Sequence, residues 1–199
     1  MSPLKVLMYG LFIFIHAVAC KAEPHKLADQ SQQAAIKVIT SGKLSAEMEV
    51  KAPAREAWDI FGTLKLIDVV VPSIFKEIKV LKGDGGVGTI LDLIFYPGAP
   101  FSSYEERIHK VDEREMSKEI DVYRGGFLDV GFNMFRIRWD VKPKSKTSCI
   151  AKVTLEFDVK EDSVANISYA SIQPFIGMMK AVANYLAKNQ KSLQHTPNI

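Results

Sequence analysis

Apolar and polar side chains alternate through long stretches of the chain, beginning at residues 43–50. Here Leu44, Ala46, Met48 and Val50 alternate with polar residues, a period of two that is typical of a strand with one buried face. Six further stretches are separated by turn signals such as Gly-Gly, Pro-Gly and Asp-Glu. We expect these strands, whose close spacing favours antiparallel hairpins, at residues 78–82, 89–96, 102–111, 114–123, 130–141 and 147–160.

Helical patterns flank this series of strands. Pro53 suits the first turn of a helix that continues through Phe61 and ends at Gly62, and a second short helix is expected at residues 64–70. Near the C-terminus, Pro174 lies in a segment whose apolar residues recur at spacings of three and four: Ile172, Phe175, Ile176, Met179, Val182, Ala183 and Leu186. The pattern predicts an α+β fold, in which a seven-stranded, curved antiparallel sheet grips one long C-terminal helix and is joined by two short helices.

Composition limits the range of partners. The chain has 199 residues, of which 47% are hydrophobic and 25% charged, with a formal net charge of +3. Such a small excess, without any run of Lys and Arg, argues against nucleic acid and against an anionic membrane as partners.

The N-terminal segment differs from the rest of the chain. A basic residue, a short apolar run and an Ala-x-Ala site predict a secretory signal peptide at residues 1–20. The alternative is a membrane anchor, although the run is shorter than the ~20 residues that a spanning helix needs. We expect a linker at residues 21–41, one pocket domain at 42–190 and a tail at 191–199. The expected location is the secretory pathway (endoplasmic reticulum lumen, vacuole or extracellular space), with no membrane association once the signal is removed.

Two further residues bear on that location. Signal cleavage leaves Cys149 without a convincing partner, so no disulfide framework is expected. Asn166 begins an Asn-Ile-Ser glycosylation sequon, which gives weak support for residence in the lumen.

One lysine lies on an apolar strand face. In residues 114–123, Lys118 shares its face with Met116, Ile120 and Val122, and in the preceding strand Tyr104 and Glu106 share a face with Ile108. If the hairpin pairs Lys110 with Arg114, Glu106 lies directly opposite Lys118, and a shift by two residues leaves the two diagonal. Either register brings a carboxylate, a phenol and an amine to one wall.

Such a trio has two interpretations. Burial lowers the pKa of an amine and a nearby carboxylate raises it, so the group can move protons at a carbonyl or an amine. Alternatively, Lys118 extends to the mouth of a pocket and Glu106 holds it in a purely structural pair. The alternation pattern leaves both open. Leu93, Phe95, Phe135, Ile137 and Met179 are expected to line the pocket.

The sequence gives little support for nucleotide binding, metal binding or a catalytic triad. The glycine-rich loop that contains Gly83, Gly85, Gly86 and Gly88 joins two expected strands and lacks the ending of a phosphate-binding loop, so a glycine-rich hairpin close to the pocket is favoured over a nucleotide site. The four His residues are scattered without metal-ligand spacing, and no Ser/His/Asp or Cys/His motif occurs. We expect no metal and no cofactor.

Several motifs resemble the plant birch-pollen-allergen superfamily, also called pathogenesis-related class 10, and within it the S-norcoclaurine synthase branch. They are KGDGGVGTILD at residues 82–92, FYPG at 95–98, YEE at 104–106, VD at 111–112, GGFLDVG at 125–131 and SCI at 148–150. The resemblance covers about residues 43–188. It implies a helix-grip fold and a stereoselective Pictet–Spengler condensation of dopamine with 4-hydroxyphenylacetaldehyde to (S)-norcoclaurine, a lyase reaction of benzylisoquinoline alkaloid biosynthesis, without a cofactor.

The resemblance also implies roles for three residues. Lys118 would handle protons during carbonyl attack and dehydration, Glu106 would remove the ring proton after cyclisation, and Tyr104 would shape the pocket mouth and hydrogen-bond substrate. The implied partners are a small aromatic amine and an aldehyde, with the protein a monomer or a weak homodimer.

Ile137 departs from the norcoclaurine branch, which has an aspartate at that position. The related norbelladine synthase branch is similar here in having an apolar residue, and it joins an amine to an aldehyde without ring closure dominating. Two alternatives therefore stand beside the cyclising enzyme: an imine-forming enzyme, and a non-catalytic carrier of hydrophobic plant metabolites or hormones.

Overall fold

The computed structural model describes residues 39–71 and 74–194. These residues belong to one compact unit, Lys37–Ile199. The expected signal peptide and most of the expected linker lie outside the described residues. Within the described ranges, no helix is both long and apolar enough to cross a membrane.

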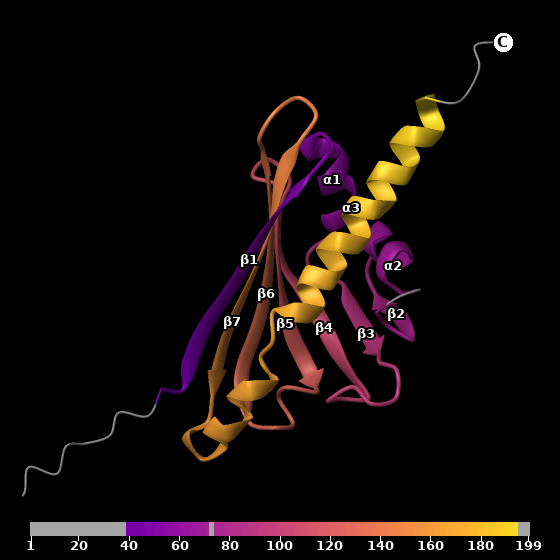
Figure 1. The fold of residues 1–199 in the computed structure, drawn as a ribbon. Helices are drawn as coiled ribbons and strands as arrows, with labels where there is room; N and C mark the ends of the chain where they lie inside the picture. Colours follow the sequence, from indigo (N-terminus) through magenta and orange to yellow (C-terminus); the bar gives the residue numbers. More distant parts are fainter. Residues whose placement is uncertain (1–38, 72–73, 195–199) are drawn as a thin grey trace, which may run out of the picture. The chain divides into compact units, whose positions relative to one another are not determined.

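Seven antiparallel strands in the described residues form one sheet (Figure 1). Their order is β1-β7-β6-β5-β4-β3-β2. The first and last strands, β1 and β7, are therefore neighbours, and every other neighbouring pair is consecutive in sequence. The strands are β1 (Ser41–Val50), β2 (Glu77–Lys82), β3 (Ile90–Ile94), β4 (Ser103–Asp112), β5 (Ser117–Gly125), β6 (Phe132–Pro143) and β7 (Cys149–Val159). The predicted seven-stranded antiparallel sheet is confirmed.

The helices pack on one face of this sheet. α1 (Ala54–Phe61) begins after Pro53 and ends at Gly62, α2 (Lys65–Val70) follows it, and α3 (Gln173–Gln194) is the long C-terminal helix. α3 contacts both short helices and strands β1 and β7 (Figure 1). It extends into residues 191–194, which the sequence pattern assigns to the tail.

A 3₁₀ helix, η1 (Glu161–Tyr169), lies between β7 and α3 and was missed from the sequence. None of its residues is buried, so it has no apolar stripe that a periodicity argument could detect.

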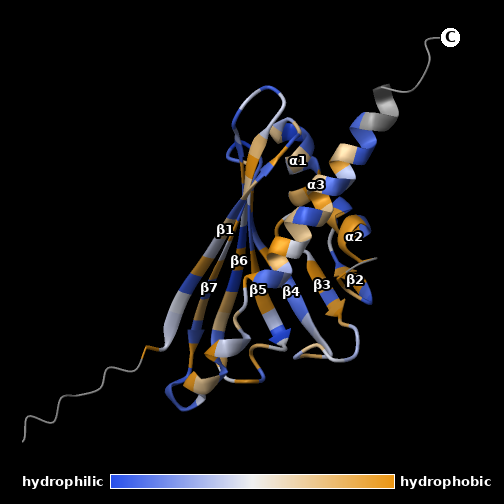
Figure 2. Ribbon diagram, viewed as in Figure 1, coloured by the Kyte–Doolittle hydropathy of each residue, from blue (hydrophilic) through white to orange (hydrophobic). Residues whose placement is uncertain are grey.

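The core lies between α3 and the inner face of the sheet. Orange and blue segments alternate along the strands in Figure 2, because successive side chains point to opposite faces. On β7, Val153 and Leu155 have no exposed surface, and Met179 and Val182 of α3 are equally buried.

The β4–β5 hairpin has a different register from either one considered above. Val111 pairs with Lys118 and Glu106 pairs with Val122, so Glu106 and Lys118 are neither opposite nor diagonal. The Asp112 carboxylate accepts hydrogen bonds from the backbone N–H groups of Arg114 (3.1 Å) and Glu115 (2.9 Å), and this Asx-type turn delays the start of β5 to Ser117. A register shift between Ile108 and Lys110 adds to the offset.

We expect Leu155→Ala to lower the free energy of unfolding by about 3 kcal/mol, because the site is fully buried in a paired strand and truncation leaves a cavity. Urea denaturation monitored by Trp fluorescence measures the change. Val87→Ala is the control, since Val87 is 67% exposed and its truncation should cost less than about 0.5 kcal/mol. Equal effects of the two substitutions would contradict this location of the core.

Candidate active site

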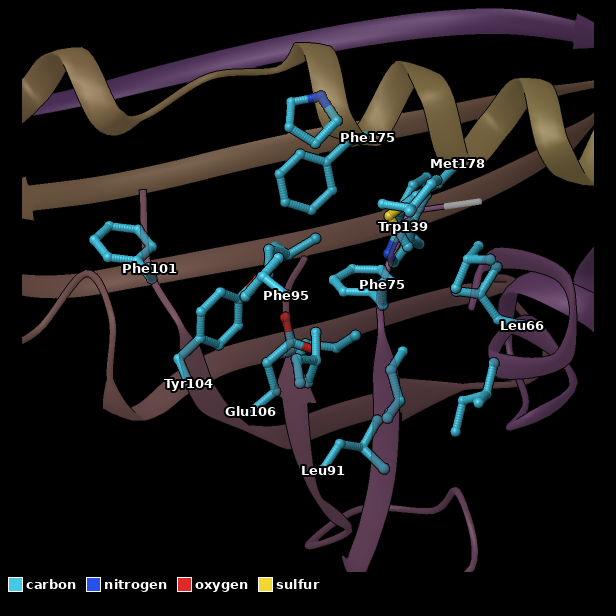
Figure 3. A pocket seen from close by; sticks show the side chains of 18 of the residues that line it. Leu66, Phe75, Leu91, Phe95, Phe101, Tyr104, Glu106, Trp139, Phe175 and Met178 are labelled. Carbon is cyan, nitrogen blue, oxygen red and sulfur yellow. The ribbon is translucent and has the colours of Figure 1, made fainter. Parts of the chain in front are cut away.

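A cavity of about 340 Å³ lies between the inner face of β3–β6 and the helices α2 and α3. Its size is that of a small-molecule site. In Figure 3, Phe175 and Met178 reach into it from α3, opposite the strands that carry Leu91, Tyr104 and Glu106. Most lining residues are aliphatic or aromatic, so the cavity favours an apolar or aromatic occupant.

Three titratable side chains lie on the strand walls of this cavity. Tyr104 and Glu106 come from β4 and Lys118 comes from β5, and they are 6%, 7% and 4% exposed. Their inward direction follows from the alternation along β4, where residues 104, 106 and 108 are buried. The structure thus brings together the trio singled out in the sequence, with Glu106 and Lys118 interacting electrostatically across the cavity wall rather than as a cross-strand pair.

The position of Tyr104 depends on a glycine turn. Its backbone pairs with Gly125, and at Gly126 (φ +53°) a Cβ would lie 2.8 Å from the Tyr104 Cβ, so no larger residue fits. The ring of Tyr104 packs near those of Phe95 (5.2 Å between centroids) and Phe127 (5.8 Å). These contacts hold the ring beside Glu106, close enough for the hydroxyl and the carboxyl group to shift each other's pKa.

Strand pairing and the adjacent turn fix the position of Lys118. It pairs across the β5–β6 ladder with Trp139, whose ring stacks on Phe61 at 5.1 Å. Glu113, in the β4–β5 turn, accepts a hydrogen bond from the Trp58 Nε1 at 2.8 Å and holds this turn against α1. Its negative charge also favours the protonated form of Lys118.

Burial dominates the protonation of all three groups. It raises the pKa of Glu106 to about 7, against the opposing effects of the Tyr104 hydroxyl and the Lys118 charge. It lowers the pKa of Lys118 to about 8, although Glu106 and Glu113 act in the opposite direction. The pKa of Tyr104 rises well above its usual value through burial and the adjacent Glu106 carboxylate. A carboxyl group and an amine that both titrate near neutral pH can exchange protons with a bound substrate.

The expected lining residues divide into two groups. Leu93, Phe95 and Ile137 lie on the cavity wall, whereas Phe135 and Met179 do not and are fully buried behind it. Phe127 stacks on Phe135 with 3.7 Å between centroids and itself lines the cavity. Met179 is displaced about 100° around α3 from Met178, which takes the lining position instead.

Other predicted features lie elsewhere. The glycine-rich loop connects β2 to β3; its residues Gly83, Gly85 and Gly88 have positive φ angles, and the Gly88 N–H donates to the Ile108 carbonyl on β4. Asn166 lies in η1, and its side-chain nitrogen, the atom that would carry a glycan, donates a hydrogen bond to the Val130 carbonyl at 2.8 Å. The glycosylation site stays a prediction.

Sequence reasoning missed the helical and loop parts of the wall. They include Leu66 and Val70 of α2, Phe75, and a pair of aromatic rings, Phe101 and Tyr169, that lie 5.6 Å apart between centroids. The apolar residues Leu66, Ile67, Val69 and Val70, interrupted only by Asp68, were a signal for the α2 contribution. No pattern indicated that Phe101 and Tyr169, from separate connecting segments, would meet.

The part of the chain that the structure describes contains no cluster of three or more His, Cys, Asp or Glu side chains that could hold a metal ion. Its free cysteine, Cys149, is buried.

Comparison with known proteins identifies relatives of the whole domain. Residues 39–189 match the model of the pathogenesis-related protein Bet v 1 family. A norbelladine synthase of Narcissus pseudonarcissus is 36% identical over 76% of this chain and 95% of its own, and an S-norcoclaurine synthase of Thalictrum flavum subsp. glaucum is 33% identical over 71% and 67%. The X-ray structure of norcoclaurine synthase from Thalictrum flavum in complex with dopamine and hydroxybenzaldehyde superposes with a TM-score of 0.68, at 29% identity over 81% of this chain and 91% of that one.

We expect the stability of the wild type relative to Glu106→Gln to fall by about 3 kcal/mol as pH rises from 4.5 to 7. The folded pKa of Glu106 exceeds its usual value, so the folded state binds the proton more tightly. That contribution is complete below pH 4.5 and is lost as pH rises through about 7.

Urea unfolding at a series of pH values measures this difference. Glu105→Gln, on the outer face of the same strand, controls for the loss of one carboxylate. A difference between wild type and Glu106→Gln that does not change with pH would contradict the burial of a titrating Glu106.

Proposed function

The chain belongs to the pathogenesis-related protein Bet v 1 family, and from this premise we propose that it is an enzyme that condenses an aromatic amine with an aromatic aldehyde. The observation that carries the proposal is the pair of buried titratable groups, Glu106 and Lys118, on the wall of an otherwise apolar cavity. A pocket that only stores apolar ligands gains nothing from a buried carboxyl and a buried amine, whose desolvation is costly. The resemblance to norbelladine and norcoclaurine synthases supports the same reaction class.

The first stage would form a carbon–nitrogen bond. The neutral amine attacks the aldehyde carbon, protonated Lys118 donates a proton to the carbonyl oxygen, and the Glu106 carboxylate accepts one from nitrogen. The protonated Glu106 carboxyl group then donates its proton to the carbinolamine hydroxyl, which leaves as water, and an iminium ion and the Glu106 carboxylate remain. The buried carboxylate then stabilises this cation, because their attraction is stronger inside a poorly hydrated cavity than in water.

The second stage would close a ring, as in a Pictet–Spengler reaction of dopamine with 4-hydroxyphenylacetaldehyde that gives (S)-norcoclaurine. The electron-rich ring carbon attacks the iminium carbon, and Glu106 removes the ring proton to restore aromaticity. The Tyr104 hydroxyl, which lowers the pKa of Glu106, would favour the carboxylate form that accepts this proton. The bound dopamine and hydroxybenzaldehyde of the solved Thalictrum relative support substrates of this size and chemistry.

A second candidate stops at the imine. Ile137 lines the cavity, is 1% exposed and offers no polar atom to a catechol hydroxyl, so it provides no hydrogen bond that would fix the ring for closure. The 36% identity to norbelladine synthase supports this candidate. The apolar wall also suits a carrier of hydrophobic metabolites, which would bind such ligands without converting them.

We expect purified protein to convert dopamine and 4-hydroxyphenylacetaldehyde to (S)-norcoclaurine in enantiomeric excess, measured by chiral chromatography with mass detection. Lys118→Met should lower kcat at least about a hundredfold, because it removes the proton donor while keeping an apolar stem. Lys152→Met, at an exposed ion pair with Glu47 on the outer side of the sheet, is the matched control and should leave kcat unchanged.

Each outcome separates the candidates. Racemic product at the uncatalysed rate excludes the cyclising enzyme. Borohydride-trapped open-chain secondary amine, formed faster than without protein, would then identify the imine-forming enzyme. Saturable ligand binding with neither product would identify a carrier.

We also expect kcat/KM, which reports the ionisations of the free enzyme, to follow a bell-shaped pH profile with apparent pKa values near 7 and 8. The acidic limb arises because Glu106 must lose its proton to act as a base, and the alkaline limb because Lys118 must keep its proton to act as an acid. Glu106→Gln should abolish the acidic limb. An acidic limb that persists in Glu106→Gln would exclude this assignment.

A further inference from the structure

The amine of Lys118 has a second property that the proton-transfer scheme does not use. Lys118 is the one lysine among the described residues that line the cavity, and it is 4% exposed. Its neighbours on the wall include Ile120 and Trp139, and the remaining lysines with described side chains lie off this cavity. An amine on this wall is accessible to a molecule bound in the cavity.

We propose that Lys118 also acts as a nucleophile and captures aromatic aldehydes in the cavity as a reversible imine on its Nζ, without an amine co-substrate. A neutral amine next to an electrophilic carbon, in a site that excludes water, is the arrangement that forms Schiff bases. The capture requires only the cavity, its lysine and the Glu106 carboxyl group, and no amine co-substrate. It would therefore occur in a carrier as well as in a condensing enzyme.

The step balances without any further reactant. The Nζ lone pair attacks the aldehyde carbon, the carbonyl π bond breaks, and one Nζ proton passes to the oxygen to give a carbinolamine. Protonation of the carbinolamine hydroxyl by the Glu106 carboxyl group releases water as the carbon–nitrogen double bond forms. The remaining Nζ proton returns to the Glu106 carboxylate, so one amine and one aldehyde yield one imine and one water.

The electrostatic setting supports the chemistry. At pH 7.5 roughly a quarter of an amine with a pKa of about 8 is neutral, against roughly a thousandth of a lysine at its usual value. Glu106, with a pKa of about 7, is present in both of the protonation states that the dehydration step uses. The aromatic wall that includes Phe95 and Tyr104 suits the ring of an aromatic aldehyde.

Reductive trapping tests the inference directly. The full chain is incubated at pH 7.5 with 4-hydroxybenzaldehyde and sodium cyanoborohydride in an amine-free buffer, and intact mass and tryptic peptides are measured. We expect one adduct per chain at low aldehyde concentration. Trypsin does not cleave after a modified lysine, so the adduct should appear in a peptide of residues 115–124 that contains an uncleaved Lys118.

Variants sharpen the assignment. Lys118→Arg keeps the positive charge but cannot form the imine, so its adduct yield should fall at least tenfold, while Lys51→Arg at an exposed ion pair with Glu49 should trap as the wild type does. Glu106→Gln should slow trapping at Lys118 at least tenfold, because it removes the proton donor for dehydration. Thermal unfolding of each variant verifies that the fold is intact.

Site mapping in the wild type decides the question even if Lys118→Arg does not fold. Adducts spread over surface lysines, with residue 118 modified no faster than the others, would overturn the proposal. Condensation activity is assayed separately without cyanoborohydride. If the protein traps the aldehyde at Lys118 but shows no condensation activity, only the proposed function is refuted. If it catalyses condensation but does not trap the aldehyde, only this inference is refuted.

Discussion

The main physical constraint in this structure is the burial of a carboxyl group and an amine in a cavity that is otherwise apolar. Glu106 and Lys118 are each less than a tenth exposed, and desolvation of their charged forms is the largest influence on the protonation of both. Burial brings their pKa values to within about one unit of each other, at about 7 and about 8. Near neutral pH, both groups are therefore present in their protonated and deprotonated forms. This near balance gives the site its capacity for proton transfer, and it is a cost that the rest of the fold must offset.

Rigid neighbouring residues hold the buried groups in place. The Gly125-Gly126 turn lets Tyr104 approach closely, and the stack of Phe127 on Phe135 fills the space behind it. On the other side, the Trp58–Glu113 hydrogen bond fixes the β4–β5 turn against α1 near Lys118. The site is thus held by paired strands and packed rings, which restrict the trio to few rotamers.

Strand alternation was enough to predict the sheet and the inward direction of Tyr104, Glu106 and Lys118, because burial on one face imposes a period of two. The long helix was predicted from apolar residues at spacings of three and four. Alternation could not fix the register of the β4–β5 hairpin, since register depends on turn geometry, here the Asp112 turn, and not on which face is apolar. Nor could it separate a lining residue from one buried behind the wall: Phe135 and Phe127 are both apolar, and only packing decides which one faces the cavity. The 3₁₀ helix η1 left no apolar pattern to detect.

The meeting of Phe101 and Tyr169 has a consequence for the size of molecule that the cavity can hold. The two rings belong to different connecting segments, and Phe101 also lies with its centroid 4.8 Å from that of Phe127, so this part of the wall is made of side chains that can separate without breaking a strand. A reaction that joins two molecules makes a product larger than either of them. In the proposed condensation, the cavity would therefore have to accommodate a product larger than either substrate, and side chains on connecting segments can adjust to that size more readily than those on paired strands.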